Sequence, residues 1–117
     1  MSTSTTLVET AYTIMRPGAP DVDASQSLPL EPGWRDLKPV ISRLLHGASP
    51  EHVSVLHRGD KRDMFVDCSG KLKGLPRNDA ATAIYRAATM AREPLRDPET
   101  LPAIYGTAVL FHRPVWF

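Results

Sequence analysis

Two stretches of the chain place apolar side chains at the spacing of a helix. The first begins after Gly33, and its apolar residues recur at steps of three and four: Trp34, Leu37, Ile41, Leu44 and Leu45. With Asp36 as its N-cap, Pro39 would fall in the first turn, where the amide that proline lacks has no intrahelical partner in any case. Gly47 is then the expected C-cap.

The second stretch is rich in alanine and ends before Pro94, which cannot continue a helix. Asn78 or Asp79 opens it as an N-cap. Its expected buried face consists of small residues, which would let the helix approach a sheet closely: Ala80, Ile84, Ala87, Ala88 and Ala91. Tyr85, Arg86 and Thr89 are expected at its sides or on its outside.

Other stretches alternate apolar and polar residues, or concentrate β-branched and aromatic ones, as strands do. They cover residues 7–15, 52–57, 64–66 and 103–112, with a short strand near 27–30 inside a proline-rich loop. The second and third form a hairpin through a charged turn. The last is apolar enough to lie at the centre of the sheet, and Gly106 within it indicates a bulge or a close approach of another segment.

The order β-α-β-β-α-β predicts a two-layer α+β fold, with two helices on one face of a mostly antiparallel sheet of four or five strands. Residues 1–6 are small and polar and are expected to form a disordered tail, followed by a single domain over 7–117. The terminal Val115-Trp116-Phe117 is expected to tuck into the core. A homodimer edge is the alternative, so the chain is expected to be a monomer or a homodimer.

Composition narrows the class of protein without naming a function. The 117 residues are 42% hydrophobic and 23% charged, which is ordinary for a globular domain. No apolar run approaches the ~18 residues of a membrane span, and the first residues lack the features of a signal peptide. We therefore expect a cytoplasmic protein without membrane association. The single cysteine, Cys68, excludes an intrachain disulfide and is expected to be an exposed, incidental thiol.

The net charge of +1 conceals an uneven distribution. Residues 1–33 contain one Arg against four acidic residues, a net charge of −3, whereas residues 34–92 contain eleven Lys or Arg against six acidic residues, a net charge of +5. A basic middle attracts acidic partners. It falls short of the strongly basic balance of most nucleic-acid binders, which leaves nucleic acid as the less favoured partner.

The loop over residues 70–82 is the strongest candidate site. Two glycines and a proline define a turn that leads into the N-terminus of the second helix, where free amides and the helix dipole favour anions. Lysines and an arginine add full positive charges there. The predicted ligand-binding residues are Lys71, Lys73, Gly74, Arg77, Asn78 and Thr82. The alternative is a capped, solvated loop whose cations contact only water.

No catalytic constellation is visible. His52 and His57 are five residues apart on a strand and face opposite sides, so they cannot bind one metal together. No Cys or His pair has metal-ligand spacing. No acid or nucleophile lies at a sequence spacing from a histidine that would indicate catalysis. Asp63 and Asp67 share a strand face, but neighbouring cations favour surface pairing. We expect no enzyme, no metal and no cofactor.

Several segments resemble an uncharacterised family of small phage and plasmid proteins, a domain of unknown function. The segments are Phe65-Val66-Asp67, the Gly70 to Asn78 run with its Gly-x-Leu-x-Gly-Leu-Pro-x-Asn motif, Ala81-Thr82, and Gly106 to Phe111. The resemblance spans about residues 34–117. The position after Asp67 is often acidic in that pattern and here is Cys68, so nothing that depends on a paired carboxylate carries over.

The resemblance implies a bacterial mobile element and no particular reaction. Together with the loop, it predicts an accessory protein that binds an anionic small molecule or an acidic protein surface without catalysis. Such a binder could antagonise a host defence. The alternative prediction is a nucleic-acid-binding accessory or regulatory protein, and an enzyme is the third and least favoured class.

Overall fold

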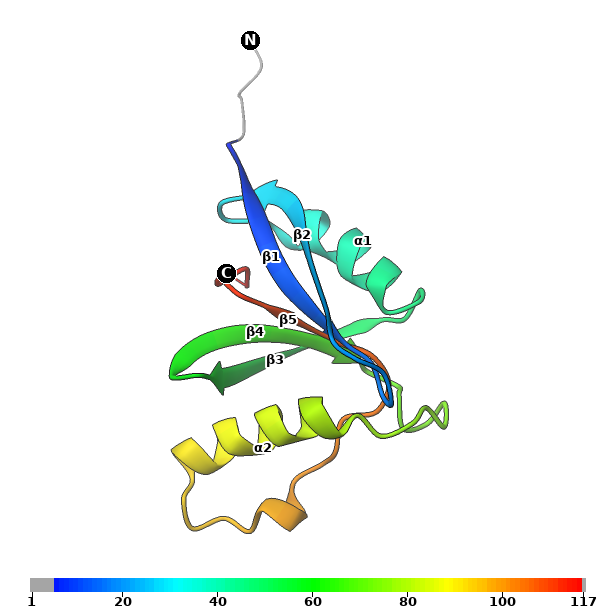
Figure 1. Cartoon of the computed structure of the whole chain (residues 1–117), viewed down its shortest axis with the longest axis vertical. Coiled ribbons are helices and arrows are strands. Elements are labelled where there is room, and N and C mark those ends of the chain that lie inside the picture. Colours follow the sequence, from blue (N-terminus) through cyan, green and yellow to red (C-terminus); the bar gives the residue numbers. More distant parts are fainter. Residues whose placement is uncertain (1–5, 117) are drawn as a thin grey trace.

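The computed structural model describes residues 6–116 and contains a five-stranded antiparallel sheet and two α-helices (Figure 1). The elements are β1 Leu7–Met15, β2 Val22–Pro29, α1 Trp34–Leu44, β3 Pro50–His57, β4 Asp60–Asp67, α2 Asp79–Arg92, the short 3₁₀ helix η1 Pro98–Thr100, and β5 Ala108–Phe111. The strand order β2-β1-β5-β4-β3 puts β5 at the centre. The α+β class and the central last strand are confirmed. Residues 1–5 of the expected tail lie outside the described residues.

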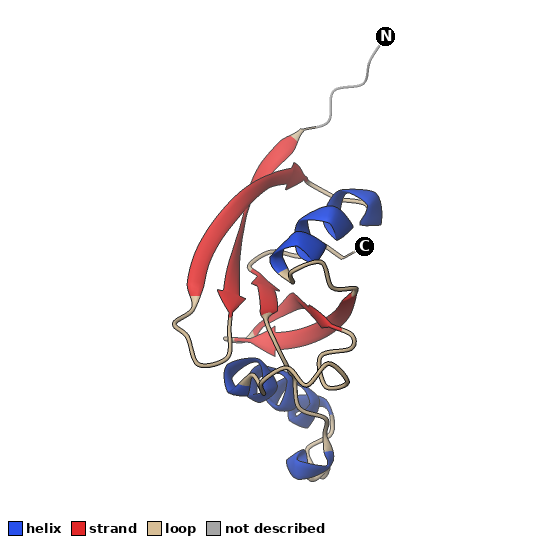
Figure 2. Ribbon diagram, turned by 90° about the vertical axis from the view of Figure 1, so that its right-hand side faces the viewer, coloured by secondary structure: helices blue, strands red, loops and turns tan. Residues whose placement is uncertain are grey.

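The two helices cover opposite faces of the sheet, and not one face as expected (Figure 2). Phe65 of β4 packs in the core beneath α1, whereas its neighbours Met64 and Val66 pack in the core beneath α2. Side chains alternate between the faces of a strand, so an unbroken apolar run needs cover on both sides. The result is three layers instead of two.

The core on the α1 face is aromatic and the core on the α2 face is built from smaller residues. The first joins Tyr12, Leu28, Leu37, Val40, Ile41, Leu45, Ala48, Phe65, Val109, Phe111 and Val115. The second joins Met15, Val55, Met64, Val66, Ala81, Ala88, Ile104, Ala108 and Leu110. Alanines on the helix allow α2 to lie close to β3.

Helix α1 begins three residues earlier than expected, at Trp34. Its N-cap is Gly33, whose amide donates to Asp36 Oδ2 at 3.0 Å, so Asp36 acts from the third helical position. Pro39 consequently lies inside the helix. The carbonyl of Arg35, which would have accepted a bond from residue 39, sits on an exposed residue where water can replace it.

Helix α2 begins at Asp79 with Asn78 as N-cap, as expected, but buries a different face. Its buried residues are Ala81, Thr82, Ala88 and Thr89, while Ala80, Ala87 and Ala91 of the expected face are exposed. Thr89 is therefore inside, contrary to expectation. The small side chains leave the apolar periodicity weak, and Thr82 fixes this face toward the segment before β5, because its Oγ1 accepts from the amide of Ile104.

Strand β2 is twice the length of the expected short strand. It runs antiparallel to β1 over eight residues, and its polar residues are tolerated because it is an edge strand. The β3–β4 hairpin is confirmed. Its two-residue turn has Arg58 and Gly59 both at positive φ, the geometry that matches the twist of paired strands.

The described part of the C-terminus packs against the sheet. Val115 is fully buried in the aromatic core, and the ring of Trp116 stacks on His52 with centroids 4.5 Å apart. Phe117 lies outside the described residues. No helix within residues 6–116 is long and apolar enough to cross a membrane.

Candidate functional site

The loop predicted as a site is fastened to the segment before β5. Asn78 is 1% exposed, and its amide nitrogen donates to the carbonyls of Met15 at 3.0 Å and Gly106 at 2.9 Å. Its Oδ1 accepts from the amide of Ala81 at 3.1 Å, the N-cap bond. Thr82 Oγ1 accepts from the amide of Ile104 at 2.9 Å. Both predicted site residues are buried and use their polar groups within the chain.

The glycines of the loop region allow close backbone contact with the same segment. A Cβ on Gly70 would lie 2.5 Å from the carbonyl oxygen of Tyr105, and a Cβ on Gly106 would lie 2.7 Å from a methyl group of Leu75. The amide of Gly106 also donates to the carbonyl of Pro76 at 2.8 Å. The Gly-x-Leu-x-Gly-Leu-Pro-x-Asn run therefore has a packing role in this structure. The expected close approach at Gly106 is confirmed.

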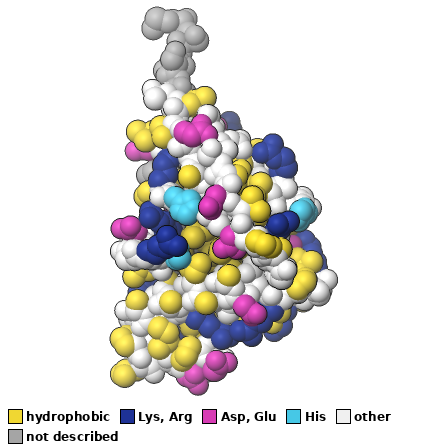
Figure 3. Space-filling model, in the orientation of Figure 1, with side chains coloured by type: hydrophobic (Ala, Val, Ile, Leu, Met, Phe, Trp, Pro, Cys, Tyr) yellow, Lys and Arg dark blue, Asp and Glu magenta, His cyan; other side chains and the backbone are white. Residues whose placement is uncertain are grey.

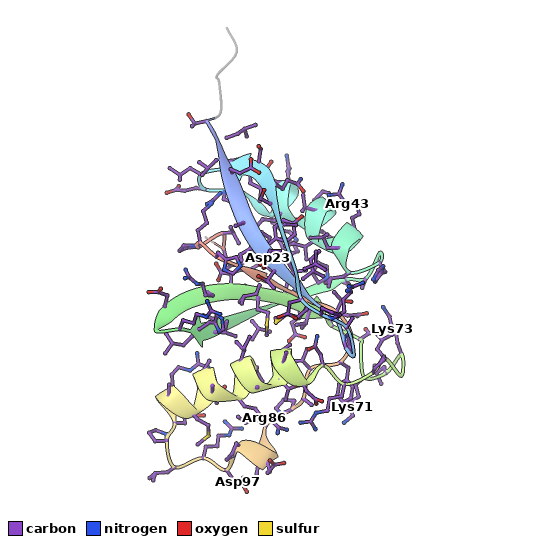
Figure 4. The ribbon with its side chains drawn as sticks, in the orientation of Figure 1. Asp23, Arg43, Lys71, Lys73, Arg86 and Asp97 are labelled. Carbon is purple, nitrogen blue, oxygen red and sulfur yellow. The ribbon has the colours of Figure 1, made fainter. Side chains whose placement is uncertain are left out.

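Two of the three predicted cations already have carboxylate partners. Lys73 Nζ lies 2.8 Å from Asp67 Oδ2, and Arg77 Nε lies 3.0 Å from Asp79 Oδ1. Lys71 has no ion-pair partner within residues 6–116. Figure 4 shows both lysines on the loop that projects beside the start of α2. Gly74 is exposed with a φ of +71°, which suits glycine in this turn.

Asp67 is held in its charged form. Burial raises the pKa of this carboxyl group, whose side chain is 5% exposed, but the hydrogen bond from Lys73, the amide of Ser69 and the charge of Lys73 outweigh it. The net effect is a pKa below the usual 3.8. A hollow of about 310 Å³ adjoins this pair, with His46 and Thr107 on its wall. The Asp67 charge cancels that of Lys73 there.

A larger hollow, of about 590 Å³, lies on the α2 face of the sheet. Helix α2 lies against β3, and this hollow opens between the start of α2 and residues of β1, β5 and the β3–β4 hairpin. The groove, as we name this hollow, is lined by Ala11, Tyr12, Thr13, Met15, Asp21, Asp23, His57, Arg58, Arg62, Ala80, Ile84, Leu110 and His112. In Figure 3 the Lys and Arg side chains at the level of β4 gather on the left with histidines and carboxylates beside them.

A chain of hydrogen bonds crosses one side of the groove. Thr13 Oγ1 lies 2.6 Å from Asp23 Oδ1 and 2.7 Å from His112 Nε2. A hydroxyl has one proton and an ionised carboxylate only accepts, so Thr13 donates to Asp23. His112 Nε2 must then carry a hydrogen and donate to Thr13. The remaining ring nitrogen, Nδ1, accepts in the neutral ring and donates in the charged one.

Arginines form the opposite wall, where the β3–β4 hairpin ends. Arg62 donates to the carbonyl of His112 at 2.7 Å and to Asp60 at 3.3 Å, while its Nε is buried without a partner within the described chain. Arg58 is exposed and makes no ion pair with residues 6–116. One guanidinium is therefore anchored and the other is available.

The positive charge converging on the groove acts on His57. Burial lowers the pKa of His57 below its usual 6.5. The charges of Arg58, Arg62 and His112 lower it further. His57 is consequently mostly neutral at pH 7, and a neighbouring anion would be needed to favour its protonated form.

The hydrogen-bond chain of the groove does not activate Thr13. Thr13 gives its proton to Asp23, so His112 does not activate it as a nucleophile. Within residues 6–116 no group of three His, Cys, Asp or Glu side chains could hold a metal ion. Cys68 is exposed, as expected, and does not line the groove.

Sequence reasoning missed this groove because its residues come from distant segments. Thr13 and His112 are 99 positions apart, and the residues next to each in the sequence do not indicate a site. One signal was within reach: pairing β1 with an eight-residue β2 would have put Asp23 beside Thr13. The opposite facing of His52 and His57 is confirmed, since His52 packs with Phe65 on the α1 face and His57 lines the groove.

Comparisons with protein-family models, curated proteins and solved structures gave no match to this chain. The resemblance to phage and plasmid proteins therefore stays a prediction, and the functional conclusion rests on the side chains of the groove.

Proposed function

We propose that this chain is a nonenzymatic protein that binds a small molecule carrying an anionic group in the groove. The observation that supports this is the convergence of Arg58, Arg62, His57 and His112 on one hollow with an apolar floor. A hollow of this size with a few polar groups is typical of small-molecule sites. Burial lowers the pKa of His57 most, and the charges of Arg58, Arg62 and His112 lower it further, which agrees with a positive potential at the hairpin end of the groove.

The two walls differ in charge, which defines the ligand further. The arginine wall favours a carboxylate or phosphate group, with Arg58 as the free guanidinium. The β2 wall carries Asp21 and Asp23, which accept hydrogen bonds. The floor of Met15, Ile84 and Leu110 suits an apolar body. The proposed ligand therefore has an anionic group at one end and a hydrogen-bond donor at the other.

This proposal keeps the expected ligand class but moves the site away from residues 70–82. The loop's Lys73 and Arg77 are paired with carboxylates, and Asn78 and Thr82 are buried. Nucleic acid is a poorer fit because carboxylates interrupt the cations of the groove. An accessory role for a mobile element, antagonism of a host defence, and a cytoplasmic monomer or homodimer remain predictions.

Thermal unfolding in the presence of candidate anions tests the proposal. The panel would hold nucleoside monophosphates, cyclic nucleotides, amino acids, dicarboxylates and inorganic phosphate. A compound that binds the native state adds about 2.7 kcal/mol of stability at a hundredfold excess over its Kd. We expect Arg58→Ala to remove the shift and Lys71→Ala, an exposed cation in the loop, to preserve it. The proposal fails if no compound shifts unfolding, or if Lys71→Ala removes the shift and Arg58→Ala does not.

The pH dependence of binding provides a second test. A bound anion offsets the repulsion that lowers the pKa of His57, so binding is accompanied by proton uptake at this ring. Affinity measured by calorimetry should rise as the pH falls from 8 to 6. His57→Gln should flatten this dependence. An affinity that is independent of pH in the wild type would contradict the placement of the anion beside His57.

A further inference from the structure

Strand β3 offers an unpaired edge. It forms the end of the sheet and pairs with β4 alone. Within residues 6–116, no backbone group from another element bonds to its outer side. The exposed amides and carbonyls of an edge strand are a template for pairing with a further strand. β3 is therefore open to strand addition from another chain.

A hollow runs along this edge. It has a volume of about 410 Å³ and is lined by Ser54, Val55 and Leu56 of β3 and by Ala88, Ala91 and Arg92 of α2, with Lys61 from β4. Successive residues of a strand point to opposite faces. Because this hollow is lined by three consecutive residues, it reaches side chains of both faces and must therefore run along the edge of the strand. In Figure 1, α2 runs beside β3, and residues of α2 line the other side of the hollow.

The small side chains of α2 leave space in the hollow for side chains of an added strand. Ala88 and Ala91 are the residues of the helix that border the hollow before Arg92, and neither has a side chain beyond Cβ. Leu56 is 44% exposed on the strand side. A strand laid against β3 would bury this leucine and pack its own side chains against the alanines.

The positive charges beside the hollow favour an acidic partner segment. Lys61 and Arg92 are its charged lining residues, and both are positive. Neither makes an ion pair with residues 6–116, whereas the nearby Arg96 is paired with Glu93 at 3.0 Å. Two free cations at the end of a pairing edge complement carboxylates on an incoming strand.

We propose that β3 and α2 form a docking site for an extended, acidic segment of a partner protein, which adds to the sheet as a sixth strand. Backbone hydrogen bonds to β3 supply affinity, and carboxylates opposite Lys61 and Arg92 supply selectivity. This hollow shares no lining residue with the groove, and the proposal does not depend on the small-molecule function.

Fluorescence anisotropy with a defined probe tests the site. The probe is a fluorescein-labelled eight-residue peptide of alternating valine and aspartate. One control peptide replaces aspartate by lysine. A second keeps the aspartates but carries N-methyl groups on alternate backbone amides, which removes strand pairing without changing charge. We expect saturable binding of the first peptide alone.

Protein variants locate the binding. Ala91→Trp fills the hollow, and the matched control Ala83→Trp adds the same ring at another exposed position of α2. We expect the first to weaken binding at least roughly tenfold and the second to leave it unchanged. Lys61→Glu with Arg92→Glu should weaken binding by a similar factor, and Lys71→Glu should not.

Several results would overturn the proposal. Equal binding of the N-methylated peptide would mean attraction by charge without strand addition. Equal binding of the lysine peptide would remove the acidic selectivity. Sedimentation that shows a dimer of the wild type, abolished by Ala91→Trp, would assign the edge to a second copy of the chain instead. Circular dichroism of each variant confirms that it is folded before binding is compared.

Discussion

His52 Nε2 lies 2.8 Å from Asp63 Oδ1, across the β3–β4 pair. Asp63 is 6% exposed, and its other oxygen accepts the amides of Val115 at 2.9 Å and Trp116 at 3.1 Å. Trp116 in turn stacks on the His52 ring. One buried carboxylate therefore joins the hairpin to the C-terminal segment, and the imidazole beside it completes the set of donors that a buried carboxylate requires.

Replacing Asp63 should weaken the attachment of the C-terminal segment to the sheet and destabilise the fold. Asp63→Ala leaves two backbone amides and an imidazole nitrogen without their acceptor, so we expect a loss of about 2–4 kcal/mol in the free energy of unfolding. Asp60→Ala, on the same strand but exposed, should cost less than about 0.5 kcal/mol. Urea unfolding followed by tryptophan fluorescence measures both. Equal midpoints for the two variants would contradict the role given to Asp63.

Asn78 should matter more than an N-cap alone. Asn78→Ala removes the cap bond. It also leaves the buried carbonyls of Met15 and Gly106 without the hydrogen-bond donor that Asn78 supplies. We expect a cost of about 2–4 kcal/mol, above the ~1 kcal/mol typical of a cap. Asp79→Ala, the next residue, loses only an exposed ion pair with Arg77 and should cost less than about 0.5 kcal/mol. Chemical denaturation compares them, and a cost near that of a simple cap would mean that the two carbonyls find other donors.

Any side chain at position 70 should destabilise the folded protein. Its backbone does not have positive φ, so the effect of Gly70→Ala is the contact of Cβ with the Tyr105 carbonyl oxygen at 2.5 Å. We expect a destabilisation of about 1–3 kcal/mol as the two segments separate. Gly33→Ala is the matched control, because its Cβ would meet its nearest atom, in Asp36, at an ordinary 3.7 Å. Thermal unfolding of both variants checks this, and a Gly70→Ala protein as stable as wild type would contradict the close approach.

The Asp67–Lys73 pair should make stability depend on pH at the acidic end. The pKa of Asp67 in the folded protein lies below its usual 3.8, so the unfolded chain binds the proton more readily. The pair's contribution is present above pH 3.8 and is lost as the pH falls through the folded-state value. Lys73→Met should lower the unfolding midpoint at pH 7 and have a smaller effect near pH 3. Lys71→Met should change neither, and a Lys73→Met effect of the same size at both values would contradict the pairing.

The local pattern of the chain determined which elements form. Periodicity and capping residues located both helices, the β3–β4 hairpin and the apolar β5, because these features depend on neighbours within a few positions. Asn78 as the N-cap of α2 is an example. Prediction failed where local signals compete, as at Pro39, which lies inside α1 and not in its first turn.

The tertiary structure decided which surfaces are available. The cations of residues 70–82 stood out in the sequence, but Lys73 and Arg77 are paired, and the close contact of the loop with Gly106 serves packing. The placement of the helices on opposite faces agrees with the unbroken apolar runs of β4 and β5, which need cover on both sides, but these runs do not say which helix covers which face. Covering only part of the second face with α2 opened the groove.

The sequence by itself determined an α+β domain with an antiparallel sheet, because alternation, helical spacing and turn residues act over short distances. Only the tertiary structure brought Thr13, Asp23 and His112 into one hydrogen-bonded chain beside the hairpin arginines. Such a site depends on strand order and register, which arise when segments about a hundred residues apart bury their apolar faces together, and no local pattern records that choice.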